Sequence, residues 1–174
     1  HQTLIHIGGD LFVCDMMTAI WQYAMHYDVK NPHWEGRDRF VLSKGHCTPA
    51  LYPVLALRGY FPIEDLKLFR SIKGHISGHA EMRHVPGVDM STGSLGQGIS
   101  VAVGMALGAK LSGKSFRVYT ILGDGEIQEG QVLEAMMFAS HYQLDNLCII
   151  IDNNNLQIDG KITDVMSPYP IPEK

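Results

Sequence analysis

The chain has 174 residues, which suits one domain that buries a sizeable core. The formal net charge is −4, no run of Lys or Arg occurs, and no apolar stretch is long enough to span a bilayer, so we expect neither nucleic-acid nor membrane binding. Charged residues make up 18%, against about a quarter in typical soluble domains, so much of the surface is expected to contact another chain.

The first half of the chain predicts helices around one short strand. A helix is expected over residues 10–27 with Asp10 as its amino-terminal cap, and a strand over 39–42. A second helix is expected over 49–57, ended by Gly59. The apolar side chains of the first helix recur at helical spacing and would share a face: Met16, Ile20, Tyr23 and Tyr27.

The middle of the chain is rich in residues that interrupt regular structure. A short helix is expected to open at Pro62 and run to about residue 70. Residues 72–92 contain several Gly, Pro, Ser and Thr residues, which predicts a long loop. Residues 95–111 form a helix of small residues that another backbone can approach closely, and Gly113 ends it.

A strand–helix–strand unit is predicted next, over residues 117–122, 131–142 and 146–151. Both strands are nearly continuous apolar runs, which is typical of strands covered on both faces. We therefore expect an α/β fold, a mostly parallel sheet with helices on both faces, as a single domain over residues 1–174. Ligands of such sheets bind beyond the carboxyl ends of the strands, which directs attention to the loops 123–130 and 152–160.

The first of these loops reads GDGEIQEG and combines a helix amino terminus with three acids. The glycines and the helix terminus favour phosphate, but the carboxylates of Asp124, Glu126 and Glu129 would repel it. A divalent cation removes this conflict, since a carboxylate binds the metal and the metal binds the phosphates. The loop therefore predicts a metal–diphosphate site.

The second loop reads DNNNLQIDG and should lie beside the first. A carboxylate, an amide oxygen from Asn154 and a backbone oxygen would supply protein ligands for octahedral Mg²⁺. A dinucleotide fingerprint has different glycine spacing, nucleotide-hydrolase loops need GKS or GKT, and an EF-hand needs an oxygen ligand where Leu156 stands. The remaining alternative is that Asp124 only caps a helix and the Asn run only forms a turn.

Three cysteines, Cys14, Cys47 and Cys148, lie far apart in the sequence. Their odd number and the lack of a CxxC pattern argue against a disulfide framework or a structural zinc site. We expect buried, reduced thiols in a cytoplasmic protein, and no targeting segment is visible.

The two loops also carry a family resemblance. GDG with acids, followed about thirty residues later by NN, resembles the motif of thiamine-diphosphate enzymes, and the chain resembles the amino-terminal half of transketolases, especially split transketolases encoded as two halves. The motifs that carry the resemblance are HIGGDL at 6–11, RDRFVLSKGH at 37–46, GHAEM at 78–82, MSTGSLGQG at 90–98, GDGEIQEGQVLEA at 123–135 and LQIDG at 156–160.

The resemblance implies a role for particular residues. Asp124, Asn154 and the backbone carbonyl of Leu156 would bind Mg²⁺ or another divalent cation such as Ca²⁺. The residues implied to contact thiamine diphosphate are His46, Gly93, Ser94, Leu95, Gly125, Glu129 and Asn154. Those implied in catalysis are His6, His46 and His79, which would line the substrate channel, and Glu129, which would link paired active sites.

The resemblance also implies an activity and a partner. The reaction would transfer a two-carbon ketol unit from a ketose phosphate to an aldose, as in pentose phosphate metabolism. The pyrimidine-binding domain of the family is not recognised in this sequence, so activity is expected only with a carboxy-terminal partner half, as a heterotetramer of two plus two. The glycines expected where chains pack together are Gly93, Gly96, Gly98, Gly104 and Gly108.

Two positions depart from the family pattern. Ile5 precedes His6 where Gly is usual, and Ala80 follows His79 where Pro is usual, so the sugar substrate is left open. Another thiamine-diphosphate enzyme, such as a deoxyxylulose-phosphate synthase or a dehydrogenase component, remains an alternative, as does a non-catalytic binding relative. The partner half is either a separate protein or a region beyond Lys174.

Overall fold

The computed structural model describes residues 7–158 and 160–172. The larger elements are α1 (Ile7–Ala19), β1 (Arg39–Leu42), α2 (Thr48–Arg58), α3 (Gln97–Leu111), β2 (Val118–Gly123), α4 (Gly130–His141) and β3 (Leu147–Asp152). The shorter ones are the π-helical turn η1 (Ile20–Ala24), the 3₁₀ turns η2 (Ile63–Leu68) and η3 (Gly125–Gln128), the two-residue strands β4 (Leu156–Gln157) and β5 (Gly160–Lys161), and α5 (Ile162–Val165). No helix among these residues is long and apolar enough to cross a membrane.

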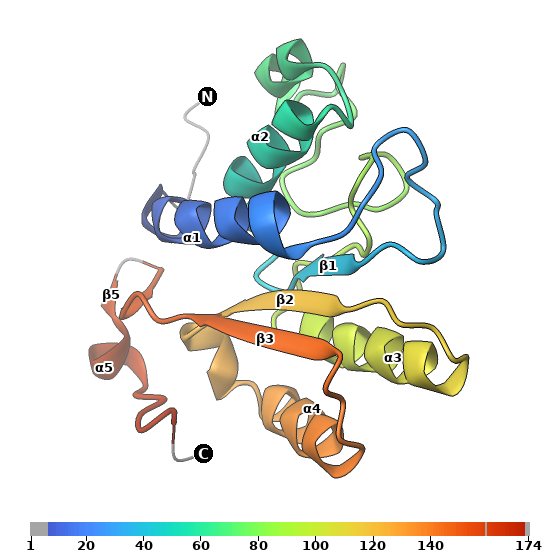
Figure 1. Cartoon of the computed structure of the whole chain (residues 1–174). Coiled ribbons are helices and arrows are strands. Elements are labelled where there is room, and N and C mark those ends of the chain that lie inside the picture. Colours follow the sequence, from blue (N-terminus) through green and yellow to red (C-terminus); the bar gives the residue numbers. More distant parts are fainter. Residues whose placement is uncertain (1–6, 159, 173–174) are drawn as a thin grey trace.

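The central sheet is parallel, with the strand order β1-β2-β3. Helices α1 and α2 lie on one side of it and α3 and α4 on the other (Figure 1). Each crossover between neighbouring parallel strands therefore contains helix, as such connections require. The predicted α/β architecture with helices on both faces is confirmed.

Two apolar cores form because alternate residues of a strand point to opposite faces of the sheet. Phe40 and Leu42 of β1 pack with α1 and α2, whereas Val41 packs with α3 and α4. In β2, Tyr119 joins the first core and Val118 joins the second. The strand β2 lies between two others and is buried over five of its six residues, as its apolar sequence predicted.

The prediction that the last strand is covered on both faces is wrong for the described residues. In β3, Cys148 is exposed and only Asp152 is buried. The reason is topological, because β3 ends the described three-stranded sheet and pairs only with β2. The expectation of buried thiols holds for Cys47 and fails for Cys148 at this edge, and Cys14 of α1 is partly buried.

The first helix differs from its prediction in two ways. It begins at Ile7, so Asp10 lies in its first turn and is not the cap. It ends as the π-helical turn η1 at Ala24, before Tyr27. The buried side chains, Val13, Met17, Ile20 and Trp21, share one face at ordinary helical spacing, and Tyr23 lies off that face and is 85% exposed.

The segment after α2 contains the predicted short helix in a tighter form. Pro62 caps the 3₁₀ helix η2, which ends at Leu68, two residues before the predicted end. From there to the start of α3 it contains no helix or strand, which confirms the predicted long loop. Helix α3 itself begins at Gln97, two residues later than predicted, after Gly96 with a positive φ of 81°.

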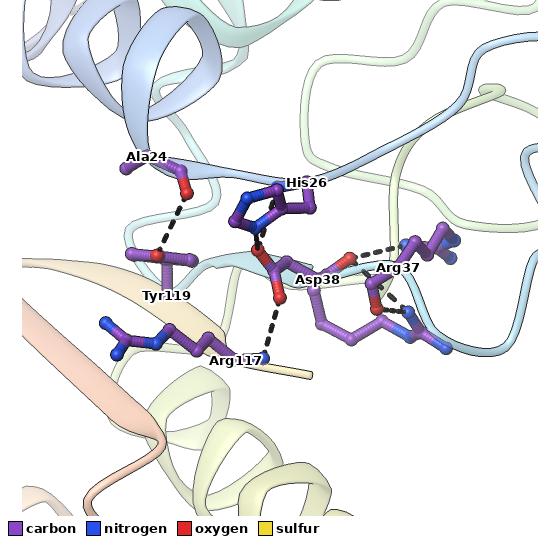
Figure 2. Close-up of polar contacts among 7 residues, drawn as sticks. Ala24, His26, Arg37, Asp38, Arg117 and Tyr119 are labelled. Carbon is purple, nitrogen blue, oxygen red and sulfur yellow. Dashed lines mark hydrogen bonds and ion pairs between the residues drawn. The ribbon is translucent and has the colours of Figure 1, made fainter. Parts of the chain in front are cut away.

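The amino-terminal ends of the strands are held by a buried carboxylate, shown in Figure 2. Asp38 Oδ2 accepts the His26 backbone N–H at 2.8 Å, and Asp38 Oδ1 accepts the Arg117 backbone N–H at 2.7 Å. These bonds join the segment after η1 to the residues that precede β1 and β2. Asp38 thus fixes the end of the sheet opposite to the loops that carry the candidate site.

Candidate functional site

The loops that follow β2 and β3 meet, as the parallel sheet predicts. The Asp124 backbone N–H donates to the Asp152 carbonyl at 3.1 Å, and the Asn155 backbone N–H donates to Asp124 Oδ2 at 2.7 Å. The Leu156 backbone N–H donates to Asn154 Oδ1 at 2.9 Å, which gives this loop a tight turn. The three residues predicted to bind a metal, Asp124, Asn154 and Leu156, are therefore brought to one edge of the sheet.

The GDG turn holds Asp124 in a buried position with 1% exposure. Its Oδ1 accepts the Gly125 backbone N–H at 2.9 Å, which caps η3. A side chain at Gly125 would lie 3.3 Å from Gln157 Cγ, so β4 packs over this glycine. Burial raises the pKa of Asp124, and the Asp152 carboxylate adds to the effect while the two N–H donors oppose it.

A buried ion pair beneath this loop is a functional feature that sequence reasoning missed. Lys44 Nζ lies 2.6 Å from Asp152 Oδ2, and both side chains are 3% exposed. Asn154 Nδ2 donates to the same carboxylate oxygen at 3.2 Å. In the sequence, Lys44 stands out only as part of the RDRFVLSKGH motif at 37–46. Its role depends on the Asp152 carboxylate, which is 108 positions away in the sequence.

The pair also sets the charge of Lys44. Burial alone would lower the pKa of this amine, but the nearby Cys47 and Asp152 more than offset the burial, so the pKa of Lys44 lies above its ordinary value. Burial has the opposite effect on the neighbouring Cys47, because the charged form of a thiol is the deprotonated one, and it raises the pKa of this thiol to about 12. Lys44 is therefore a buried cation that helps to orient the amide of Asn154 through Asp152.

The loop after β1 interlocks with the loop before α3. A side chain on Gly45 would lie 2.5 Å from the backbone carbon of Thr92, so only glycine fits there. Thr92 Oγ1 donates to the Leu42 carbonyl at 2.6 Å. The Ala80 backbone N–H donates to the Gly45 carbonyl at 3.2 Å, a bond that proline could not make. These contacts hold together the segments that carry His46, His79 and Gly93.

A hollow of about 430 Å³ opens over these segments. Its lining residues are His79, Ser91, Thr92, Gly93, Ser94 and Gln97. A side chain on Gly93 would lie 2.9 Å from His79 Cδ2, so the imidazole covers this glycine. Leu95 is 36% exposed at the same loop, and His46 is half-buried in the loop after β1. His6 and Ile5 lie outside the described residues.

The three acids of the first loop have different surroundings. Asp124 and Glu126 are buried, whereas Glu129 is exposed and lies against Gly96. Burial raises the pKa of Glu126, and its hydrogen bonds from the protein oppose that shift. Glu126 is therefore already bonded to donors of the protein itself. Of the three acids that were expected to crowd one ligand, Asp124 and Glu129 remain.

The donor chemistry fits a magnesium ion bound through oxygen. Within residues 7–158 and 160–172, no group of three or more His, Cys, Asp or Glu side chains is arranged to hold a metal. The predicted ligands are of another kind, because they are one carboxylate (Asp124), one amide oxygen (Asn154) and one backbone oxygen (Leu156). Hard cations accept this mixture and complete their shell with phosphate and water oxygens.

Comparison with known proteins agrees with this arrangement. The family model described as "Transketolase, thiamine diphosphate binding domain" matches residues 5–168. The chain belongs to the transketolase family. The resemblance to transketolases that the motifs carry is confirmed.

Its relatives include single subunits. It is 47% identical to the 6-deoxy-6-sulfo-D-fructose transketolase subunit SqwG of Clostridium sp. (strain MSTE9), over 97% of this chain and 62% of that protein. It is 44% identical to one subunit of the apulose-4-phosphate transketolase of Phocaeicola vulgatus, over 93% of this chain and 57% of that protein. The chain therefore spans about three fifths of these relatives.

The fold is also that of solved transketolases. The structure of transketolase from Leishmania mexicana superposes with a TM-score of 0.82 at 32% identity, covering 96% of this chain and 30% of that one. The full-length enzyme of Rhodobacter capsulatus is 41% identical, and the chain covers 25% of it. The matched region is thus a minor part of the longer enzymes.

Proposed function

We propose that the chain is the diphosphate-binding part of a transketolase that transfers a two-carbon ketol unit from a ketose phosphate to an aldose acceptor. The observation that carries the proposal is the 2.7 Å bond from the Asn155 N–H to the Asp124 carboxylate, in a chain of this family. It joins the loops after two neighbouring strands and forms one oxygen-rich edge. The single domain over residues 1–174 would contribute this edge to a larger active site.

The cation would be Mg²⁺ or a similar divalent ion such as Ca²⁺. Asp124, Asn154 and the carbonyl of Leu156 would hold it, and the ion would link them to the diphosphate. Asp124 supports this role because its carboxylate is 1% exposed and its pKa is raised by burial, so a bound cation would supply compensating charge. The Lys44–Asp152 pair supports it by fixing the amide of Asn154.

The cofactor would extend from this edge to the hollow. Gly125 would contact the diphosphate with His46 close to it, and Gly93, Ser94 and Leu95 would lie near the rings. When bound, thiamine diphosphate supplies a carbon nucleophile and an electron sink for the cleavage and formation of carbon–carbon bonds. The chain's own residues would orient the reactants and exclude water from the reacting carbons.

The histidines would handle the protons of the sugar. His79 lines the hollow, where its imidazole nitrogens would exchange protons and hydrogen bonds with the hydroxyl groups of the sugar. His46 and His6 are assigned to the same channel. Glu129, which is exposed beside Gly96, would belong to a hydrogen-bonded network that links paired active sites.

A second polypeptide or region would complete the site. Two relatives are named as subunits, and they support a partner half that carries the pyrimidine-binding domain. We propose a two-plus-two assembly in the cytoplasm that acts on sugar phosphates, with activity only when both halves are present. The candidate substrates include 6-deoxy-6-sulfo-D-fructose and apulose 4-phosphate, for which those relatives are named.

The test measures binding and catalysis by the chain mixed with its candidate partner half. Calorimetry with thiamine diphosphate should show Mg²⁺-dependent binding, and ketose phosphates should be cleaved when an aldose is present. Asp124→Asn should abolish both, whereas Asp164→Asn, at an exposed carboxylate of α5, should change neither. Consumption of pyruvate in place of ketose cleavage would assign the chain to another thiamine-diphosphate reaction. Absence of cofactor binding with the partner present would indicate a non-catalytic relative.

A further inference from the structure

Glu126 is a buried carboxylate to which no role has been assigned above. It is 2% exposed and is among the largest fully buried side chains of the described chain. Its Oε1 accepts the Ser43 hydroxyl at 2.5 Å and the Gly96 backbone N–H at 2.9 Å. Its Oε2 accepts the Gly123 backbone N–H at 3.2 Å. A buried charge of this kind persists only where such donors surround it.

The three donors belong to three separate segments of the candidate site. Ser43 begins the loop that leads to His46. Gly96 ends the segment of Gly93, Ser94 and Leu95 that is proposed to lie near the cofactor rings, and Gly123 precedes Asp124. These donors lie 83, 30 and 3 positions from Glu126. One carboxylate therefore joins every described segment that is proposed to contact thiamine diphosphate, apart from the loop after β3.

The chemistry at this position calls for an acceptor with several lone pairs and no proton to donate. An ionised carboxylate offers two oxygens and about four acceptor sites. A glutamine in the same place would turn its NH₂ group toward either the Gly123 N–H or the two donors on Oε1. One donor at least would lose its partner, and a buried donor without a partner is unfavourable.

We propose that Glu126 is a positioning residue that holds the 93–96 segment at a fixed place relative to the GDG turn, so that a ligand spanning both meets a preformed site. This inference rests on the proposed function for the identity of the spanning ligand. Preorganisation of this kind improves the binding of a ligand that touches both segments and leaves the binding of a smaller one almost unchanged. Thiamine diphosphate would touch both segments, whereas inorganic diphosphate would touch only the GDG turn.

The first experiment follows amide hydrogen exchange in the purified chain without ligand. Glu126→Gln should speed exchange about tenfold or more at Gly96 or at Gly123, whichever backbone N–H its NH₂ group faces, since a hydrogen bond to a charged group is lost there. Exchange at residues 118–122 of β2 and within β3 should change much less. The control, Glu134→Gln, removes one exposed carboxylate from α4 and should leave exchange as it is. Unchanged exchange at both Gly96 and Gly123, or equal acceleration throughout the chain, would overturn the inference.

The second experiment compares two ligands in the presence of Mg²⁺ and the partner half. Glu126→Gln should weaken thiamine diphosphate at least about tenfold more than inorganic diphosphate, in line with the loss of one charged hydrogen bond. Equal weakening of both ligands would refute the positioning role. Failure of the wild-type protein to bind thiamine diphosphate would instead count against the proposed function, so the two failures are distinguishable.

A milder variant keeps the test decisive if Glu126→Gln does not fold. Ser43→Ala removes one donor and leaves the carboxylate bonded to the two backbone N–H groups. Ser43→Ala should also weaken the binding of thiamine diphosphate more than that of inorganic diphosphate, but by a smaller factor than Glu126→Gln. A Ser43→Ala protein with wild-type exchange at Gly96 and wild-type affinity for both ligands would contradict the proposal.

Discussion

Two glycines of α3 give a matched test of how closely this helix is packed. Gly98 and Gly104 lie on the same helix, and each can be changed to alanine. A Cβ at Gly98 would lie 2.6 Å from Ser43 Cα and 2.6 Å from Ser43 Oγ, which is closer than real side-chain contacts. A Cβ at Gly104 would meet nothing within 4 Å. The same substitution should therefore have opposite effects at the two sites.

The magnitudes follow from those contacts. Alanine in a helix interior is favoured over glycine by about 1 kcal/mol, so Gly104→Ala should stabilise the chain by up to that amount. At Gly98 the obstacle includes backbone, which cannot rotate away, and overpacking of this kind costs about 1–3 kcal/mol. The two variants should differ in free energy of unfolding by about 2 kcal/mol or more, with Gly98→Ala the less stable.

Urea unfolding of the isolated chain, followed by circular dichroism, measures this difference from the midpoints at constant slope. Gly108→Ala serves as a second open position, since a Cβ there also meets nothing within 4 Å. Equal stability of Gly98→Ala and Gly104→Ala would refute the packing argument. Destabilisation by Gly104→Ala that grows with protein concentration would show that another copy covers this face.

Three further experiments have expected outcomes. Lys44→Met should destabilise the chain by about 3–5 kcal/mol in urea unfolding, because it leaves the buried carboxylate of its partner unpaired. Lys110→Met, which breaks an exposed ion pair, should change stability by less than about 1 kcal/mol. Iodoacetamide at pH 8 should alkylate the exposed Cys148 well before the buried Cys47, whose pKa is about 12, as followed by mass spectrometry of digests. Ala80→Pro should reduce the free energy of unfolding by about 1 kcal/mol, because it removes one backbone hydrogen bond to the neighbouring loop.

A different result in each experiment would contradict the reasoning behind it. Equal losses of stability in the Lys44 and Lys110 variants would mean that burial does not strengthen the dependence on the ion pair. Alkylation of both thiols at one rate in the folded protein would contradict the packing around Cys47. An Ala80→Pro protein as stable as the wild type would show that the bond from its N–H to Gly45 contributes nothing.

The parallel sheet and the place of the site follow from local sequence patterns. Apolar runs bounded by glycine and polar residues predict β2 and β3, and the GDG and NNN segments come directly after them. Because parallel strands finish at one edge, Asp124 and Asn154 had to meet. The motif resemblance then named the family, which the comparisons confirm. The individual roles of the site residues stay predictions.

Local patterns failed where contacts between distant segments decide the outcome. The spacing of apolar residues placed Tyr23 on the buried face of the first helix, but the face that packs on the core runs through Val13, Met17 and Trp21, and Tyr23 faces solvent. The expectation that the glycines of the STGSLGQG motif pack between chains stays a prediction. A Cβ at Gly93, Gly96 or Gly98 would already meet neighbours of the same chain within 3 Å, whereas a Cβ at Gly104 or Gly108 would meet nothing within 4 Å.

The sequence by itself thus determined the fold class, the edge of the sheet that carries the site and the family, because these depend on periodicity and on order along the chain. The tertiary structure decided which charged groups are buried and with what partners. Lys44 meets Asp152 and Glu126 meets Ser43 across separations of 108 and 83 residues. No local pattern encodes such pairs, since their energies arise only when folding removes both groups from water.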